Sequence, residues 1–160
     1  MAQSSVVQQK APVTTITRQE LIGNLNEDLA REYQTIIAYT VYSQVLKGAQ
    51  YMTIAKELEK HAGEELAHAL TVAKHIDYLG GTPTVTSLPV VVAERAEGIL
   101  RAALDNENNT VRSYRERVQQ CEALGEYGIA EDIREILRQE QEHQIDLATA
   151  LGENVSDVTG

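Results

Sequence analysis

Two short stretches of the sequence repeat the same pair of potential metal ligands. EELAHA contains Glu65 followed three residues later by His68, and EQEHQI contains Glu140 followed three residues later by His143. Residues three positions apart on an α-helix project from one face, so each pair can offer a carboxylate oxygen and an imidazole nitrogen to a single ion. A single pair is a weak signal in glutamate-rich helices, whereas its repetition points to a shared site.

Two further glutamates extend the repeat. Glu32 and Glu107 each lie 33 residues before the glutamate of a Glu-x-x-His pair, and each is followed seven residues later by a tyrosine, Tyr39 or Tyr114. The four glutamates interrupt apolar stripes, where bare carboxylates would repel one another and lose hydration. Two divalent ions would neutralise the four carboxylates, so the pattern predicts a two-metal site. The predicted ligands are Glu32, Glu65, His68, Glu107, Glu140 and His143.

This ligand set also limits which metals suit the site. Four carboxylates and two imidazoles favour iron or manganese, while zinc could occupy the site without redox chemistry. Each Glu-x-x-His pair is expected to serve one ion, which leaves Glu32 and Glu107 free to complete or to bridge the pair.

Composition restricts the remaining possibilities. The chain has 160 residues, enough for one domain, and contains no Trp or Phe, so its core must be built mainly from aliphatic side chains, a mix that favours helices. A formal charge of −10 argues against nucleic acid as a partner. The single Cys121 suits a reducing compartment, and no apolar run reaches membrane-spanning length. We therefore expect a cytoplasmic protein without a membrane partner.

Capping signals and glycines divide the chain into four long helices. Thr17 followed by Glu20 forms a capping-box pattern, and Gly48, the Gly80 and Gly81 pair and Gly125 act as breakers. The predicted helices cover residues 17–47, 50–79, 93–124 and 127–151. Residues 84–92 are β-branched with an internal proline and predict an extended crossover. The predicted domain is thus an all-α four-helix bundle over residues 17–151, with tails at 1–16 and 152–160.

Distances along the helices place the glutamates at one level. Glu32 lies 16 residues before Gly48 and Glu65 lies 17 residues after it, so both sit about 24 Å from the turn at 1.5 Å per residue. The second hairpin repeats this arrangement around Gly125. All four carboxylates are therefore expected to meet in one layer of the bundle.

The chain resembles the ferritin-like superfamily, most closely bacterioferritin, over about residues 17–151. The resemblance rests on four stretches, NEDLAREYQTIIAY, EELAH, LDNENN and EILRQEQEH. It implies a di-iron ferroxidase centre with two iron ions per subunit, or manganese in their place, held by the six residues above. It also implies oxidation of Fe(II) to Fe(III) by oxygen or hydrogen peroxide, with Tyr39 as a one-electron donor. Antiparallel dimers that build a homo-oligomer are implied as well.

Three positions depart from the bacterioferritin pattern. Leu66 stands where the haem-binding methionine would fall, so no haem is expected. Glu64 and Gln139 replace the aspartates that usually precede the two Glu-x-x-His glutamates and can orient the histidines. Nine residues follow Leu151, so the short fifth helix of 24-subunit cages is not expected.

Three alternative functions compete with a ferroxidase. A rubrerythrin-like peroxide reductase would usually carry another acid where Thr110 stands and a cysteine-rich module. A di-iron oxygenase would need a substrate channel, and a plain helical interaction module would need no metal. Metal content separates the last alternative from the others.

Other polar residues receive simpler interpretations. His61 is expected to be a partly exposed structural histidine, with a place beside the centre or on an iron route as the alternative. His75 is expected on the surface and Cys121 in the core. Acids outside the stripes, Glu57 and Asp132 among them, are expected on solvated faces.

Overall fold

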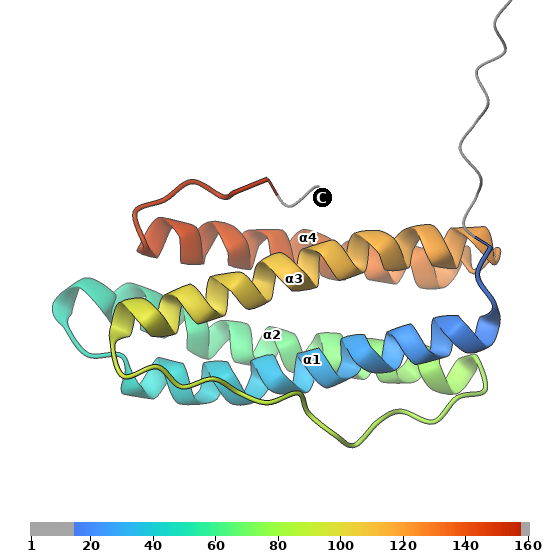
Figure 1. The fold of residues 1–160 in the computed structure, drawn as a ribbon, viewed down its shortest axis with the longest axis horizontal. Coiled ribbons are helices and arrows are strands. Elements are labelled where there is room, and N and C mark those ends of the chain that lie inside the picture. The colour runs from blue at the N-terminus through green and yellow to red at the C-terminus, as the bar shows by residue number, and fades with distance from the viewer. Residues whose placement is uncertain (1–14, 158–160) are drawn as a thin grey trace, which may run out of the picture.

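The computed structural model describes residues 15–157 and shows an all-helical bundle (Figure 1). Its helices are α1 (Arg18–Val45), α2 (Met52–Tyr78), α3 (Ala96–Ala123) and α4 (Tyr127–Ala150), with a short 3-10 helix, η1 (Ala49–Tyr51), before α2. Packing is most extensive within the hairpins α1–α2 and α3–α4. The predicted fold class is confirmed. Of the tails predicted at 1–16 and 152–160, residues 1–14 and 158–160 lie outside the described residues.

Local capping explains where the helices begin and end. The Thr17 side chain accepts a hydrogen bond from the Glu20 amide, and the Glu20 carboxylate accepts one from the Thr17 amide, which completes the predicted capping box. At the end of α3, Gly125 adopts a φ of 76° and the Glu126 amide bonds to the Cys121 carbonyl at 2.9 Å. This is a Schellman motif, and it turns the chain directly into α4.

An extended crossover joins the two hairpins and runs along α1 (Figure 1). The Leu88 amide donates to the Ala30 carbonyl at 3.1 Å, and the Tyr42 hydroxyl donates to the Val91 carbonyl. The following helix was predicted from residue 93 but begins at Ala96. The extended, α1-bound path of the crossover carries the chain past the predicted start.

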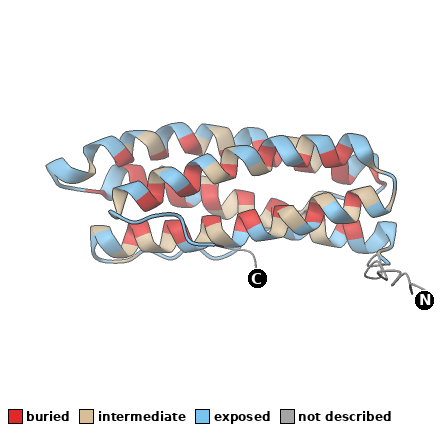
Figure 2. Cartoon of the chain, turned by 90° about the horizontal axis from the view of Figure 1, so that it is seen from above, coloured by how far each residue is buried: buried red, intermediate tan, exposed pale blue. Residues whose placement is uncertain are grey.

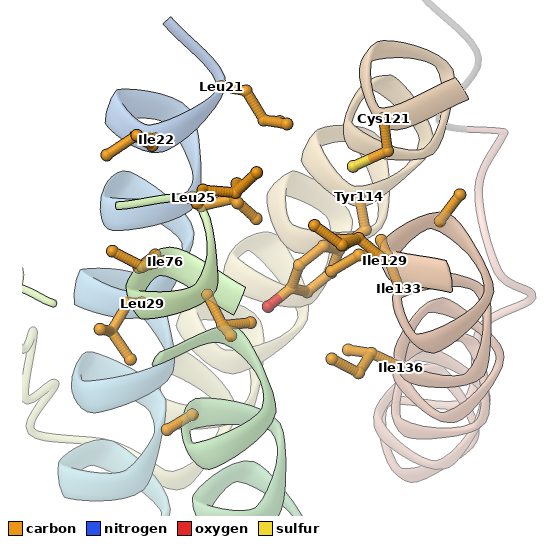
Figure 3. Packing of buried hydrophobic residues seen from close by; sticks show 14 residues of the cluster. Leu21, Ile22, Leu25, Leu29, Ile76, Tyr114, Cys121, Ile129, Ile133 and Ile136 are labelled. Atoms are coloured by element: carbon orange, nitrogen blue, oxygen red, sulfur yellow. The ribbon is translucent and has the colours of Figure 1, made fainter. Parts of the chain in front are cut away.

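The bundle core consists of two apolar clusters with a polar layer between them. One cluster surrounds Leu25, Ile76, Tyr114 and Ile133 (Figure 3), and the other surrounds Tyr39, Leu58 and Leu100. Buried positions recur every three or four residues along every helix (Figure 2). Cys121 is fully buried in the first cluster, as predicted. None of the helices within residues 15–157 is long and apolar enough to cross a bilayer.

Candidate metal centre

The six predicted ligands meet in the polar layer. Glu32 comes from α1, Glu107 from α3, and the two Glu-x-x-His pairs from α2 and α4. All six residues are at most 4% exposed. Their donor atoms form two groups in which every atom lies within 4.8 Å of the others. The groups are Glu32, Glu65, His68 and Glu140, and Glu65, Glu107, Glu140 and His143.

Glu65 and Glu140 belong to both groups because each spans the gap between the two imidazoles. The Glu65 carboxylate places Oε2 3.1 Å from His68 Nδ1 and Oε1 2.9 Å from His143 Nδ1. The Glu140 carboxylate likewise lies 3.2 Å from His68 Nδ1 and 3.1 Å from His143 Nδ1. Each glutamate of a Glu-x-x-His pair therefore faces both positions. Glu32 and Glu107, left open between completing and bridging the pair, lie at the two ends.

Each terminal glutamate receives a tyrosine from the opposite hairpin. The Tyr114 hydroxyl of α3 donates to Glu32 of α1, and the Tyr39 hydroxyl of α1 donates to Glu107 of α3. The exchange ties the hairpins together across the centre. It also explains why the sequence repeats Glu and Tyr seven residues apart.

A second set of contacts fixes the orientation of both imidazoles. His143 Nε2 lies 2.8 Å from Glu64 Oε2, and His68 Nε2 lies 2.7 Å from Gln139 Oε1. Because both partner oxygens accept, each Nε2 carries a proton, and each Nδ1 presents its lone pair to the carboxylate layer once a cation has displaced the proton on Nδ1. Glu64 and Gln139 thus take the orienting positions that the sequence pattern singled out, one with a carboxylate and the other with an amide.

When no metal is bound, protons balance the negative charge of the buried carboxylates. Burial raises the pKa of Glu65 well above its usual range, and burial together with the Glu140 carboxylate raises the pKa of Glu107 to about 7. Burial also opposes ionisation of Glu140, but the adjacent imidazoles of His143 and His68 outweigh it and lower its pKa to about 2. Burial opposes the charged form of both histidines too, yet the carboxylates around them favour that form more strongly and raise the pKa of both. Cations would have to displace these protons.

Several donor atoms in the layer have no hydrogen bond within the protein. They are Glu32 Oε2, Glu65 Oε1, Glu140 Oε2 and His143 Nδ1, all fully buried. His143 Nδ1 lies 2.9 Å from Glu65 Oε1 without the geometry of a hydrogen bond. Buried polar atoms are normally satisfied, so four such atoms converging at one level fit a site built for cations. Oxygen-rich donors with two imidazoles suit iron.

Two histidines differ from their predicted environments. His61 is 1% exposed, and its ring stacks on that of His143 at 3.9 Å between centroids. Burial, with the nearby His143, lowers the pKa of His61 to about 4. His75, expected on the surface, is 6% exposed and lies 2.8 Å from Asp132 of α4. Both are covered because the face of α2 that carries them packs against α4.

Sequence signals for these two positions existed. In the 75-residue repeat, the position equivalent to His61 is Ile136, a buried aliphatic residue. His75 lies seven residues after His68 and therefore on the same face of the helix. Asp146, which lies beside His61, was not predicted as a site residue. It follows His143 by three residues and therefore shares its face.

Comparison with known proteins agrees with this geometry. A family model of the ferritin-like domain matches residues 22–154. The bacterioferritin of Brucella melitensis biotype 1 is 27% identical over 141 residues, covering 84% of this chain and 88% of that protein. The bacterioferritin of Desulfovibrio desulfuricans is 28% identical over 125 residues, covering 78% of this chain and 70% of that protein.

A solved structure extends the likeness to three dimensions. It is a crystal structure of ferritin-like, diiron-carboxylate proteins from Bacillus anthracis, with a TM-score of 0.81 and 33% identity, and it covers 84% of this chain and 96% of that chain. Fold, buried carboxylate layer and sequence similarity lead to one conclusion. The chain belongs to the ferritin-like domain family.

Proposed function

We propose that the protein is a ferroxidase that binds two Fe(II) ions per chain and oxidises them to Fe(III) with oxygen or hydrogen peroxide. The observation that carries the proposal is the sharing of Glu65 and Glu140 between two buried donor groups. Two shared carboxylates can hold two ions a few ångströms apart, the spacing at which two-metal sites act. The bacterioferritin relatives support iron as the metal, and manganese is the alternative occupant.

The reaction balances in electrons and protons. Oxidation of two Fe(II) ions releases two electrons, which reduce oxygen to hydrogen peroxide, or hydrogen peroxide to two waters, with uptake of two protons in either case. The four carboxylates favour the ferric product, because their negative charge stabilises the more highly charged ion at short range in a buried site. Glu64 and Gln139 hold the histidine rings in place while the ions change charge.

Tyr39 is the proposed one-electron donor. When only one Fe(II) ion is present to be oxidised, the phenol supplies the second electron and a proton to the oxidant, and a further Fe(II) ion then reduces the tyrosyl radical, so that two Fe(II) ions are still consumed per oxidant. Its hydroxyl donates to Glu107, and the tyrosine is 1% exposed, so it touches the centre while remaining protected from solvent. Burial and the neighbouring carboxylates raise its pKa well above the usual range, which keeps the phenol protonated until it is oxidised. Tyr114 makes the equivalent contact with Glu32, so both tyrosines can be compared in one experiment.

An anaerobic Fe(II) titration followed by addition of oxidant tests this function. We expect two Fe(II) ions per chain to bind in the buried layer and the ferric absorbance to rise rapidly with either oxygen or hydrogen peroxide. Glu65→Ala is expected to abolish both, because that carboxylate serves both positions. An exposed acid gives the matched control, since Glu131→Ala removes a carboxylate far from the centre. Iron uptake that persists unchanged in Glu65→Ala would overturn the proposal.

The same titration separates the competing functions. A peroxide reductase would oxidise the reduced protein with hydrogen peroxide much faster than with oxygen and would then need an external electron donor. A peroxide reductase would usually carry another acid at the position of Thr110. Here the Thr110 hydroxyl donates to the Asn106 carbonyl of its own helix at 3.0 Å. An interaction module would take up no iron at all.

We further propose that the protein works in the cytoplasm as a homo-oligomer built from antiparallel dimers, in iron storage or detoxification. Leu66 and Leu70 lie one turn apart on α2 and are 52% and 65% exposed, and Ile37 of α1 is 46% exposed. Exposed aliphatic side chains in this arrangement fit contact with a second copy. Light scattering of Leu70→Lys against the unaltered protein is expected to show dissociation, and an unchanged mass would exclude this face.

A further inference from the structure

A third group of metal-binding side chains lies outside the centre, on the α2–α4 side of the bundle. It consists of Glu57, His61 and Asp146, whose donor atoms lie within 4.8 Å of one another. His61 Nε2 is 3.1 Å from Asp146 Oδ2 and 3.8 Å from Glu57 Oε2. The imidazole is buried, whereas the two carboxylate side chains are 39% and 40% exposed. The group is therefore rooted in the core and open to solvent on its outer side.

The two distances measured from His61 Nε2 match the spacing of ligands on one ion. Two atoms each about 2.1 Å from a divalent metal are roughly 3.0 to 3.4 Å apart at ligand angles of about 90 to 110°, and roughly 3.8 Å apart at about 130°. Both measured distances fall at these values. A divalent ion would balance the two carboxylates, and water could fill the remaining positions on the exposed side.

The group is not a by-product of the repeated hairpin. Positions 75 residues away in the repeat hold Asp132, Ile136 and Thr71 in place of Glu57, His61 and Asp146. The other half of the bundle thus has a buried aliphatic side chain, packed within an apolar cluster, where His61 stands. Packing alone does not require a buried histidine facing two acids at this position.

A continuous series of donor groups connects this cluster to the centre. His61, Glu64 and His143 form a further group within 4.8 Å, which shares His61 with the outer cluster and His143 with the buried layer. The His61 and His143 rings stack at 3.9 Å, and His61 Nδ1 is buried without a hydrogen-bond partner. An ion leaving the outer cluster would therefore meet ligands at each step inward.

We propose that Glu57, His61 and Asp146 form a third, solvent-accessible divalent-cation site that takes up Fe(II) and passes it by way of Glu64 to the buried centre. The existence of the site rests only on the three side chains. The direction of transfer rests on the proposed ferroxidase function.

Cobalt titration of the full chain under anaerobic conditions tests the site without any oxidation. We expect the unaltered protein to bind three Co(II) ions, and the double variant Glu57→Gln with Asp146→Asn to bind two. Glu65→Ala with Glu140→Ala is expected to retain one, and its loss of the buried pair shows which signal belongs to the centre. Glu116→Gln with Glu131→Gln removes the same charge from two exposed positions and is expected to keep three. Equal stoichiometry in the unaltered protein and the Glu57→Gln, Asp146→Asn variant would overturn the site.

Iron kinetics test the transfer step separately. The Glu57→Gln, Asp146→Asn variant is expected to need several-fold more Fe(II) for half-maximal oxidation, with an unchanged rate at saturation, because the centre itself is intact. An unchanged requirement for Fe(II) would refute transfer through this site. Failure of the ferroxidase proposal appears differently, as absent Fe(II) oxidation in the unaltered protein while the third Co(II) ion still binds. Helical circular dichroism of each variant confirms that the amide substitutions leave the fold intact.

Discussion

The two ends of the metal centre are built by equivalent halves of the repeat, yet their surroundings differ in charge. At the His143 end the outer partner is the carboxylate of Glu64, and His61 stacks on the ligand ring. At the His68 end the outer partner is the amide of Gln139, beside a cavity of about 320 Å³ that Thr71 also lines. The repeat therefore preserves the ligands but not their environment, and we expect two inequivalent metal positions.

This difference has a direct chemical consequence. A carboxylate that accepts from Nε2 makes the imidazole a stronger donor at Nδ1 than a neutral amide does. The His143 end, with more negative charge around it, is therefore expected to bind a divalent ion more tightly. The His68 end, next to the cavity, is better placed for exchange with solvent.

Loss of a shared ligand should weaken metal binding at both ends and produce the largest effect. Glu140→Ala removes a carboxylate from both groups, so Co(II) affinity at both positions should fall by more than the roughly 10- to 100-fold cost of losing an outer partner. Calorimetric titration measures this loss. Glu32→Ala provides the contrast, because it should weaken only the His68 end. Equal losses at both ends in Glu32→Ala would contradict the assignment of terminal and shared ligands.

Substitution of the outer partners should change the difference in metal affinity between the two ends. Glu64→Gln gives both histidines an amide partner, and we expect affinity at the His143 end to fall roughly 10-fold, at the lower end of the range for outer-partner loss. Gln139→Glu is expected to raise affinity at the His68 end. The Co(II) affinities of the two buried positions should therefore converge in both variants. Affinities that keep their separation in both would show that the outer partners do not set it.

Acid should weaken metal binding, and most clearly at the His143 end. Glu107 serves only that end, and its pKa of about 7 in the chain alone means that binding below this pH must displace its proton. We expect affinity there to fall roughly 10-fold per pH unit for each proton displaced. Calorimetry in buffers of different ionisation enthalpy measures the protons released. A pH-independent affinity would contradict the prediction.

The same raised pKa sets the sign of stability against pH for the chain alone. The Glu107 pKa in the folded chain lies above its ordinary value of 4.5, so the stability that Glu107 contributes is present below pH 4.5 and is lost as pH rises through about 7. Thermal melts without metal should therefore shift to lower temperature between pH 5 and 8. Saturating Co(II) should reverse this trend, because deprotonated carboxylates then bind the ion.

The two tyrosines should give the smallest but most selective effect. Tyr39→Phe and Tyr114→Phe each remove one hydrogen bond to a terminal glutamate, so we expect similar, few-fold changes in metal affinity. Only Tyr39→Phe is expected to eliminate a tyrosyl radical signal during rapid-freeze oxidation. The Tyr39 ring lies 6.2 Å from that of His61, a neighbour that Ile136 replaces in the other half. A radical lost equally in both variants would contradict the assignment of Tyr39.

Much of the fold follows from local signals in the sequence. Thr17 and Gly125 define helix ends through capping and a positive φ, which depend on the residues themselves. The start of α3 was misplaced by three residues because the path of the crossover is set by contacts with α1, such as that of Tyr42 with Val91. The sequence spacing predicted that the four acids and two histidines lie at one level of the bundle, because the rise per residue of a helix is constant.

The surroundings of the site were harder to foresee. The burial of His61 depends on how α2 packs against α4, and the pairing of Asp28 with Arg117 at 2.6 Å joins two helices that are far apart in the sequence. Neither contact has a local spacing that would reveal it. The sharing of Glu65 between both imidazoles is also a tertiary feature, since its two oxygens reach toward different helices.

The most direct test of the account is anomalous diffraction at the iron edge from crystals loaded anaerobically with Fe(II). We expect two strong peaks inside the bundle, one next to Glu32 and His68 and the other next to Glu107 and His143, with Glu65 and Glu140 shared between them. An inner layer without peaks would contradict the central claim. A single peak with the carboxylates still paired to the histidines would contradict it as well.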